Sequence, residues 1–129
     1  MNEIVANIRR LPDLYSKDGV AKEEIYKAQT DLNVNFSEDY LEVLTSFGIL
    51  LVNGHEIIGL SGSPRMNVVV VTQEERIVDP EVNQKWYVIE QTNIDHIIIW
   101  QNQLGEIFQT QPGCGYLKIA ENLLDYIKS

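Results

Sequence analysis

The sequence predicts an α+β fold with N-terminal helices, a mostly antiparallel sheet built of hairpins, and a C-terminal helix. Three observations support this prediction. Amphipathic helical spacing is concentrated at the two ends of the chain, strand-like runs with short turns fill the middle, and 129 residues make about one ordinary domain. The composition, 44% hydrophobic and 22% charged, is close to the globular average and argues against intrinsic disorder. We expect one domain over residues 1–129.

Two helices open the predicted fold. Helical apolar spacing over residues 4–11 stops at Pro12, because a residue that precedes proline prefers an extended backbone. A loop through Asp18 and Gly19 follows. Residues 22–32 then place apolar side chains at helical intervals, which predicts a second amphipathic helix.

A third helix is predicted to start after Ser37. Its side chain is a favourable N-cap, and Glu38 and Asp39 place carboxylates at the positive end of the helix dipole. A broad apolar face follows, and Gly48 stands where a C-terminal glycine cap is expected.

The strongest local pattern is a hairpin over residues 49–58. Apolar runs lie on both sides of Asn53 and Gly54, and a two-residue Asn-Gly loop suits the positive φ angles of a type I′ turn. A loop rich in glycine and serine follows over residues 59–64.

Residues 68–78 fit two structures. The β-branched run at 68–71 favours a strand, whereas residues 72–75, Thr-Gln-Glu-Glu, resemble a capping box that opens a helix. Asp79 and Pro80 end either element.

Three further strands and a closing helix complete the prediction. Residues 86–91 and 97–100 have strand composition, and a turn leads from the second of these into a strand at 106–109, so the last two strands form a hairpin. After a turn-rich connection at 111–115, apolar residues at helical spacing over 117–127 predict the closing helix.

The charge balance limits the possible partners. Nineteen acidic residues against ten basic ones give a net charge of −9, so the overall field repels phosphate backbones. Nucleic acids and anionic membranes are therefore poor partners, and a basic protein is a good one. No apolar run reaches the roughly 20 residues that cross a bilayer, and the first residues lack a signal-peptide pattern, so we expect a cytoplasmic protein.

The negative charge is unevenly placed. Between Ala28 and Pro64 there is no lysine or arginine, and five acids supply five of the nine net charges. Such a stretch is either a solvated face that aids solubility or a binding surface that attracts a basic partner electrostatically. The five acids are Asp31, Glu38, Asp39, Glu42 and Glu56.

Residues with catalytic or metal-binding chemistry are scarce. Cys114 is the only cysteine and lies in no recognisable nucleophile pattern, and the two histidines are His55 and His96. Each histidine has an acidic neighbour, but adjacent residues of a strand point to opposite faces and do not chelate one metal. We predict no catalytic residue, no metal site and no cofactor. An enzyme that uses Cys114 or a histidine is the weakest alternative.

Trp86 and Tyr87 are candidate anchors for a partner. Strand alternation places their side chains on opposite faces of the sheet, so we expect at least one of them to look outward. An exposed aromatic ring beside an acidic rim is typical of an interface hot spot. The alternative is that Trp86 and the other tryptophan, Trp100, are both core residues.

The order of elements and several short motifs resemble the SUKH superfamily over roughly residues 22–128. This superfamily includes bacterial immunity proteins and fungal cell-wall regulators. The resemblance implies an α+β fold and a non-enzymatic immunity protein that binds and neutralises a cognate toxin, often a nuclease. The residues that carry it are Leu32, Phe36-Ser37, Tyr40-Leu41, Leu44, Phe47-Gly48 and Gly59-Leu60, then Gly105-Glu106-Ile107-Phe108 and Leu123-Leu124-Asp125-Tyr126-Ile127.

The charge and the resemblance point to the same function. A nuclease must hold phosphates with lysine and arginine, so an acidic inhibitor can be steered to that surface. We expect an antitoxin that binds a basic toxin, and the alternative is a regulatory or scaffold module for an endogenous protein. Glu38 and Asp39 are weaker interface candidates because they also stabilise a helix start. The predicted partner-binding residues are Asp31, Glu38, Asp39, Glu42, Glu56, Trp86 and Tyr87.

Overall fold

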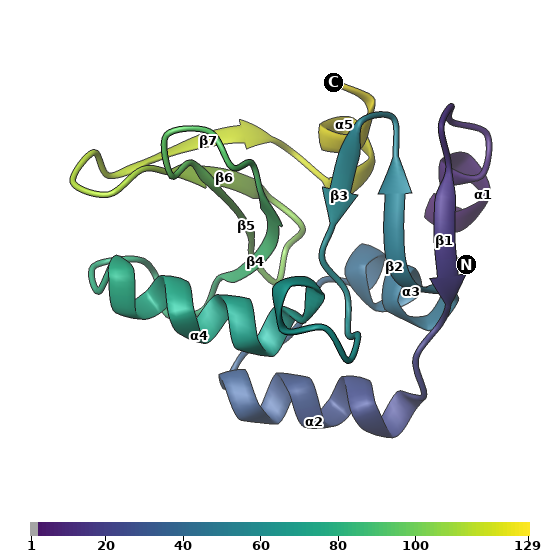
Figure 1. The fold of residues 1–129 in the computed structure, drawn as a ribbon, viewed down its shortest axis with the longest axis horizontal. Helices are drawn as coiled ribbons and strands as arrows, with labels where there is room; N and C mark the ends of the chain where they lie inside the picture. The colour runs from purple at the N-terminus through teal and green to yellow at the C-terminus, as the bar shows by residue number, and fades with distance from the viewer. Residues whose placement is uncertain (1–2) are drawn as a thin grey trace.

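The computed structural model describes residues 3–129 and confirms the α+β fold (Figure 1). Within these residues the strands form two antiparallel sheets rather than one. The helices are α1 (Ile4–Ile8), α2 (Lys22–Leu32), α3 (Glu38–Ser46), α4 (Val68–Val78) and α5 (Leu123–Lys128), with a 3-10 turn η1 at Pro64–Met66. The first sheet has the order β1 (Tyr15–Asp18), β2 (Phe47–Val52), β3 (His55–Ile57). The second has the order β4 (Tyr87–Gln91), β5 (Ile98–Gln101), β6 (Ile107–Thr110), β7 (Tyr116–Ala120).

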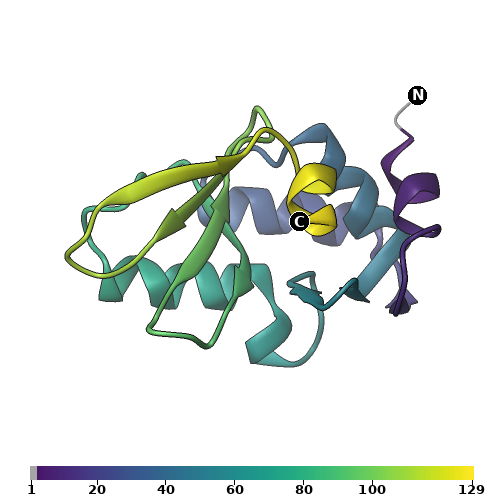
Figure 2. The ribbon, with the colours of Figure 1, turned by 90° about the horizontal axis from the view of Figure 1, so that it is seen from above.

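The two sheets meet where the chain leaves β3. The Ile58 N–H donates to the Ile89 carbonyl over 2.8 Å, so a main-chain hydrogen bond connects the end of β3 to β4. The ribbon views place α4 along the second sheet and α5 between the two sheets (Figure 1, Figure 2). One continuous cluster of buried apolar side chains draws on the helices and on both sheets.

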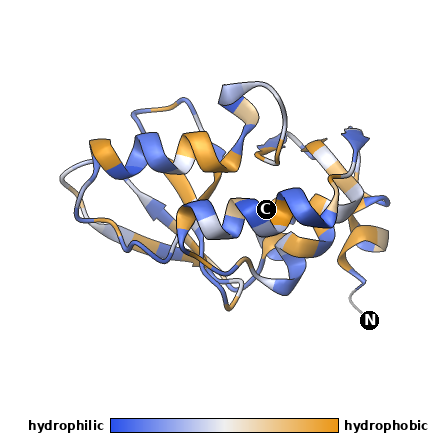
Figure 3. Cartoon of the chain, turned by 90° about the horizontal axis from the view of Figure 1, so that it is seen from below, coloured by the Kyte–Doolittle hydropathy of each residue, from blue (hydrophilic) through white to orange (hydrophobic). Residues whose placement is uncertain are grey.

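Helices α2 and α4 pack against each other on the lower side of the molecule, where Figure 3 shows them next to one another. The middle of α4 is hydrophilic and both of its ends are apolar, whereas the outer surface of α2 is largely hydrophilic. In α2 the buried side chains are Ile25, Ala28 and Leu32, which is the apolar face that its sequence predicts.

The start of α3 and the first hairpin also follow the sequence prediction. The Tyr40 N–H donates to the Ser37 hydroxyl over 3.1 Å, which is the expected N-cap. Asn53 and Gly54 have φ angles of 50° and 83°, as a type I′ turn requires. These elements depend on contacts between close neighbours in the chain, so local pattern is sufficient to predict them.

Two predictions near the first sheet are wrong. The loop expected through Asp18 contains the end of β1, a strand whose residues are mostly exposed and therefore lack an alternating apolar pattern. Gly48 does not cap α3, because the chain enters β2 directly at Phe47. A Cβ on Gly48 would lie 2.5 Å from the Asp18 carbonyl oxygen, so the residue allows β1 and β2 to approach closely.

Residues 68–78 form a helix, which decides between the two predicted alternatives. The N-cap is Asn67 rather than Thr72, since the Asn67 side-chain oxygen accepts two N–H groups of the first turn. Thr72 lies in the middle of the helix on its buried face, and its hydroxyl accepts the Val88 N–H of β4 over 3.0 Å. Packing of the valine-rich face against β4 outweighs the preference of valine for strands.

The predicted closing helix is wrong in its first half. Residues 116–120 form β7, which pairs with β6, and α5 begins only at Leu123 after the N-cap Asn122. Leu117 and Ile119 belong to this edge strand and are 62% and 37% exposed. The helical spacing of apolar residues over 117–127 therefore arises by chance, because it runs across the boundary between a strand and a short helix.

Candidate functional site

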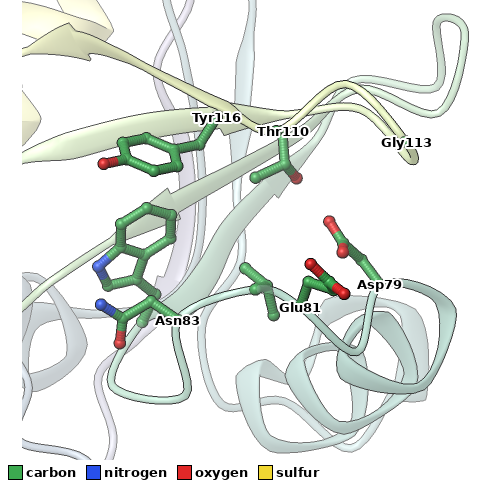
Figure 4. Close-up of a pocket in the computed structure, with 9 residues that line it drawn as sticks. Asp79, Glu81, Asn83, Thr110, Gly113 and Tyr116 are labelled. Atoms are coloured by element: carbon green, nitrogen blue, oxygen red, sulfur yellow. The ribbon is translucent and has the colours of Figure 1, made fainter.

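A cleft of about 500 Å³ lies between the segment that follows α4 and the β6–β7 hairpin (Figure 4). One wall is formed by side chains of residues 79–86, and the other by residues 110–116. In Figure 4 Asp79 and Glu81 lie across the opening from Tyr116. We call this feature the acidic-aromatic cleft.

Local turns hold the two walls of the acidic-aromatic cleft. After α4, the Val82 N–H donates to the Asp79 carbonyl over 3.1 Å, and the Val82 side chain is buried. On the other wall, Gly113 and Gly115 have φ angles of 79° and 72°. These positive angles favour glycine and let the chain reverse between β6 and β7, with Cys114 exposed between them.

Two aromatic rings, those of Trp86 and Tyr116, line the walls of the acidic-aromatic cleft. Trp86 is only 6% exposed and stacks on Phe108, with ring centroids 4.1 Å apart and an interplanar angle of 7°. Tyr116 meets Trp86 edge to face at 5.2 Å and is 68% exposed. The cleft therefore joins a fixed, buried indole to a ring that a partner can contact.

The carboxylates of the acidic-aromatic cleft have no internal counterion. Neither Asp79 nor Glu81 makes a side-chain hydrogen bond or ion pair with another residue of the described chain, 3–129. The basic side chains of the neighbouring segments contact other groups, and Lys85 Nζ donates to the Asn33 carbonyl over 3.4 Å. Arg76 donates to three carbonyls, among them Gln84 at 2.8 Å, and Lys118 pairs with Glu106 and Glu121 at 2.7 and 2.8 Å.

The five acids of the lysine- and arginine-free stretch do not gather at one site. Asp31 lies on α2 and Glu56 on β3, which are well separated in Figure 1. The first pairs with Lys27 at 2.7 Å and the second with Arg65 at 3.2 Å, and exposed pairs of this kind contribute about 0–1 kcal/mol. The remaining three acids, all on α3, are Glu38, Asp39 and Glu42.

The expectation that Trp86 or Tyr87 looks outward is wrong. The two residues are 6% and 0% exposed, because α4 and the start of α3 cover β4 on its two faces. The Tyr87 hydroxyl accepts the Ser37 N–H at 2.9 Å and donates to Gln101 at 2.8 Å, so Tyr87 is a core residue. Trp86 remains relevant as part of the cleft wall, and the exposed aromatic residue beside it is Tyr116.

Asp79, Glu81 and Tyr116 are not among the residues that the sequence predicts to bind a partner. The acids and the tyrosine are more than thirty positions apart, and only the pairing of β6 with β7 brings the tyrosine to the end of α4. The available signal was an aromatic residue directly after a Gly-Cys-Gly turn, together with acids that follow a helix end.

A family model described as SUKH_5, SMI1-KNR4 cell-wall, matches residues 1–129, the whole chain. The chain belongs to the SUKH family. A comparison with curated proteins found no match. Across the described part of this SUKH chain, no helix has the length and apolar character needed to cross a membrane.

The two histidines of the SUKH chain pair with buried glutamates rather than with their acidic sequence neighbours. His55 Nδ1 lies 2.9 Å from Glu90 Oε1, and Glu90 also accepts the Tyr126 hydroxyl and the Glu56 N–H. His96 Nε2 lies 2.9 Å from Glu75 Oε1. Residues 3–129 contain no group of three or more histidine, cysteine or acidic side chains arranged to hold a metal ion.

Three buried tyrosines should make the SUKH chain sensitive to alkali. Burial raises the pKa of Tyr40, Tyr87 and Tyr126 above the ordinary value of 10.0, and the negative charge of Glu90 raises that of Tyr126 further. In the unfolded chain these tyrosines lose their protons only above about pH 10, so their contribution to stability is constant below that pH and falls above it. Each such tyrosine contributes a loss of about 1.4 kcal/mol per pH unit.

Urea unfolding between pH 9 and 11.5, with tyrosinate absorbance followed in parallel, measures this dependence. The variant Tyr87→Phe is expected to be less stable at pH 8 but to lose stability less steeply above pH 10. Equal slopes for the variant and the parent protein would contradict the assignment.

Proposed function

We propose that this SUKH chain is a non-enzymatic immunity protein that binds and neutralises a cognate toxin in the cytoplasm. Membership of the family over residues 1–129 carries the proposal. The net charge of −9 and the uncompensated acids of the acidic-aromatic cleft support a basic partner. A nuclease domain has this chemistry, since it holds phosphates with lysine and arginine.

Binding without bond chemistry is sufficient for this function. The negative field steers a basic domain towards the chain and sets the association rate, while buried contacts at the interface set the residence time. An acidic protein that covers the phosphate-binding surface of a nuclease excludes its substrate from that surface. Neutralisation then depends on affinity and on geometry alone.

Co-expression tests the proposed function. The product of each gene next to the gene for this chain is produced in cells with and without the chain, and any product that arrests growth is then purified together with the chain. We expect growth to be restored only when the chain is present, and the complex to dissociate as salt is raised. Unchanged growth arrest, together with no complex at low salt, would reject the immunity function.

Charge reversal tests the part played by the predicted acidic surface. The triple variant Asp31→Lys, Glu42→Lys, Glu56→Lys is expected to slow toxin association by about tenfold at low salt and to flatten the salt dependence, with a smaller effect on dissociation. Stopped-flow association measured over a salt series shows both changes.

A matched control carries the same change of charge at exposed acids elsewhere. If this control slows association as much as the test variant, steering comes from net charge alone and these three residues have no special place at the interface. The control substitutions are Glu3→Lys, Glu23→Lys and Glu74→Lys.

A regulatory or scaffold role for an endogenous protein is the second candidate, and the words "cell-wall" in the description of the matching family model favour it. This role predicts stable association with a resident protein and no protection against any product of a neighbouring gene. The co-expression experiment therefore separates the two functions.

A further inference from the structure

We propose that the acidic-aromatic cleft receives an arginine side chain from a basic segment of the partner. In this arrangement Asp79 and Glu81 pair with the guanidinium group, and the ring of Tyr116 covers one of its faces. The identity of the partner as a protein rests on the proposed function. The chemistry of the bound group rests on the cleft itself.

The cleft carries negative charge that no cation of the described chain pairs with. Asp79 and Glu81 are two carboxylates on one wall, and no residue that lines the cleft is basic. The nearby cations contact other groups, because Arg76 and Lys85 donate to main-chain carbonyls and Lys118 pairs with two other glutamates. A cation that enters the cleft therefore meets negative charge that no residue from 3 to 129 neutralises.

The shape of the cleft selects arginine over lysine. A guanidinium group is planar, so it stacks on an aromatic ring while its N–H groups point sideways to carboxylate oxygens. Figure 4 shows this combination, with Tyr116 on one side of the opening and the acids on the other. Trp86 is fixed beneath Tyr116 by its stacking on Phe108, so the aromatic wall is already in place before a partner binds.

A matched pair of tripeptides tests the proposal on the full chain. N-acetyl-Gly-Arg-Gly-amide is the probe, and the analogue with citrulline has the same shape without the charge. Binding is followed by NMR at the Trp86 indole N–H and at the amides of Gly113 and Gly115, which line the cleft. We expect saturable shifts with the arginine peptide and binding at least tenfold weaker with citrulline, because charge-assisted hydrogen bonds are lost.

Variants assign the binding to individual side chains. The double variant Asp79→Asn, Glu81→Gln is expected to bind the arginine peptide at least tenfold more weakly. Tyr116→Leu keeps an apolar side chain but loses the π face, and a loss of about threefold is expected. The control Glu23→Gln, Glu74→Gln removes the same charge from exposed positions outside the cleft and should bind within twofold of the parent protein.

Each result decides the proposal. Equal binding of the citrulline peptide, unchanged binding by the Asp79/Glu81 variant, or no shift at the cleft resonances would overturn it. If the peptide fails to bind but the chain still neutralises the toxin, the cleft assignment is wrong and the immunity function stands. If the peptide binds at the cleft but no toxin is neutralised, the immunity function is wrong and the arginine site stands.

Discussion

Replacing Glu90 with alanine is expected to destabilise the protein by about 3–5 kcal/mol. Glu90 is 7% exposed and its carboxylate accepts the Glu56 N–H at 2.7 Å and the Tyr126 hydroxyl, with His55 Nδ1 at 2.9 Å. These groups come from β3 and α5, so one side chain on β4 holds three elements together. Alanine leaves the buried Tyr126 hydroxyl and the half-buried groups of His55 and Glu56 without this acceptor, which costs more than the hydrogen bonds themselves contribute.

Urea unfolding at neutral pH measures this loss. Glu90→Gln keeps the length of the side chain and one acceptor oxygen, so an intermediate loss of about 1–3 kcal/mol is expected. The control Glu74→Ala removes an exposed glutamate from α4 and should change stability by less than about 0.5 kcal/mol. If Glu90→Ala is as stable as this control, the three elements are held together by apolar packing and the polar cluster is dispensable.

The sequence predicts those elements whose signals lie within a few residues. Lys22–Leu32 has a complete amphipathic pattern, and the cap at Ser37 and the turn at Asn53 are local chemistry. The valine run of α4 and the strand β7 are different, because their structure depends on packing and pairing with distant segments. Local residue preferences left α4 open between a strand and a helix, and they predicted a helix where β7 forms.

The candidate site shows the same dependence on tertiary structure. Trp86 lines the acidic-aromatic cleft, but its ring is buried and not exposed as strand alternation predicted. β4 lies where the second sheet meets the first, so both of its faces are covered and alternation alone does not predict exposure. An aromatic ring beside acidic side chains occurs at other residues than those predicted, and these residues, Asp79, Glu81 and Tyr116, come from two separate parts of the chain.

Gly59→Ala is expected to destabilise the protein by about 3 kcal/mol. A Cβ at this position would lie 2.2 Å from the Gly48 carbonyl oxygen, and a backbone atom cannot move aside as a side-chain end can. The Gly59 carbonyl also accepts the Val68 N–H at 2.8 Å, so a shift of the chain here disturbs the start of α4. The loop at 59–64, which looks uniform in sequence, thus has one end that tolerates no side chain.

Gly62→Ala, in the same loop, is the matched control for Gly59→Ala. Nothing lies within 4 Å of a Cβ built there, so this change is expected to be neutral or to stabilise by up to about 1 kcal/mol through the unfolded chain. Thermal and urea unfolding of both variants test the pair, and equal stability would mean that β2 and the loop separate without cost.

Because the clash is remote from the acidic-aromatic cleft, the folded fraction of Gly59→Ala should still bind the arginine tripeptide with unchanged affinity. The double variant Asp79→Asn, Glu81→Gln should show the opposite result, with unchanged stability and weakened binding of the tripeptide. This contrast separates a residue that the fold requires from residues that the partner requires.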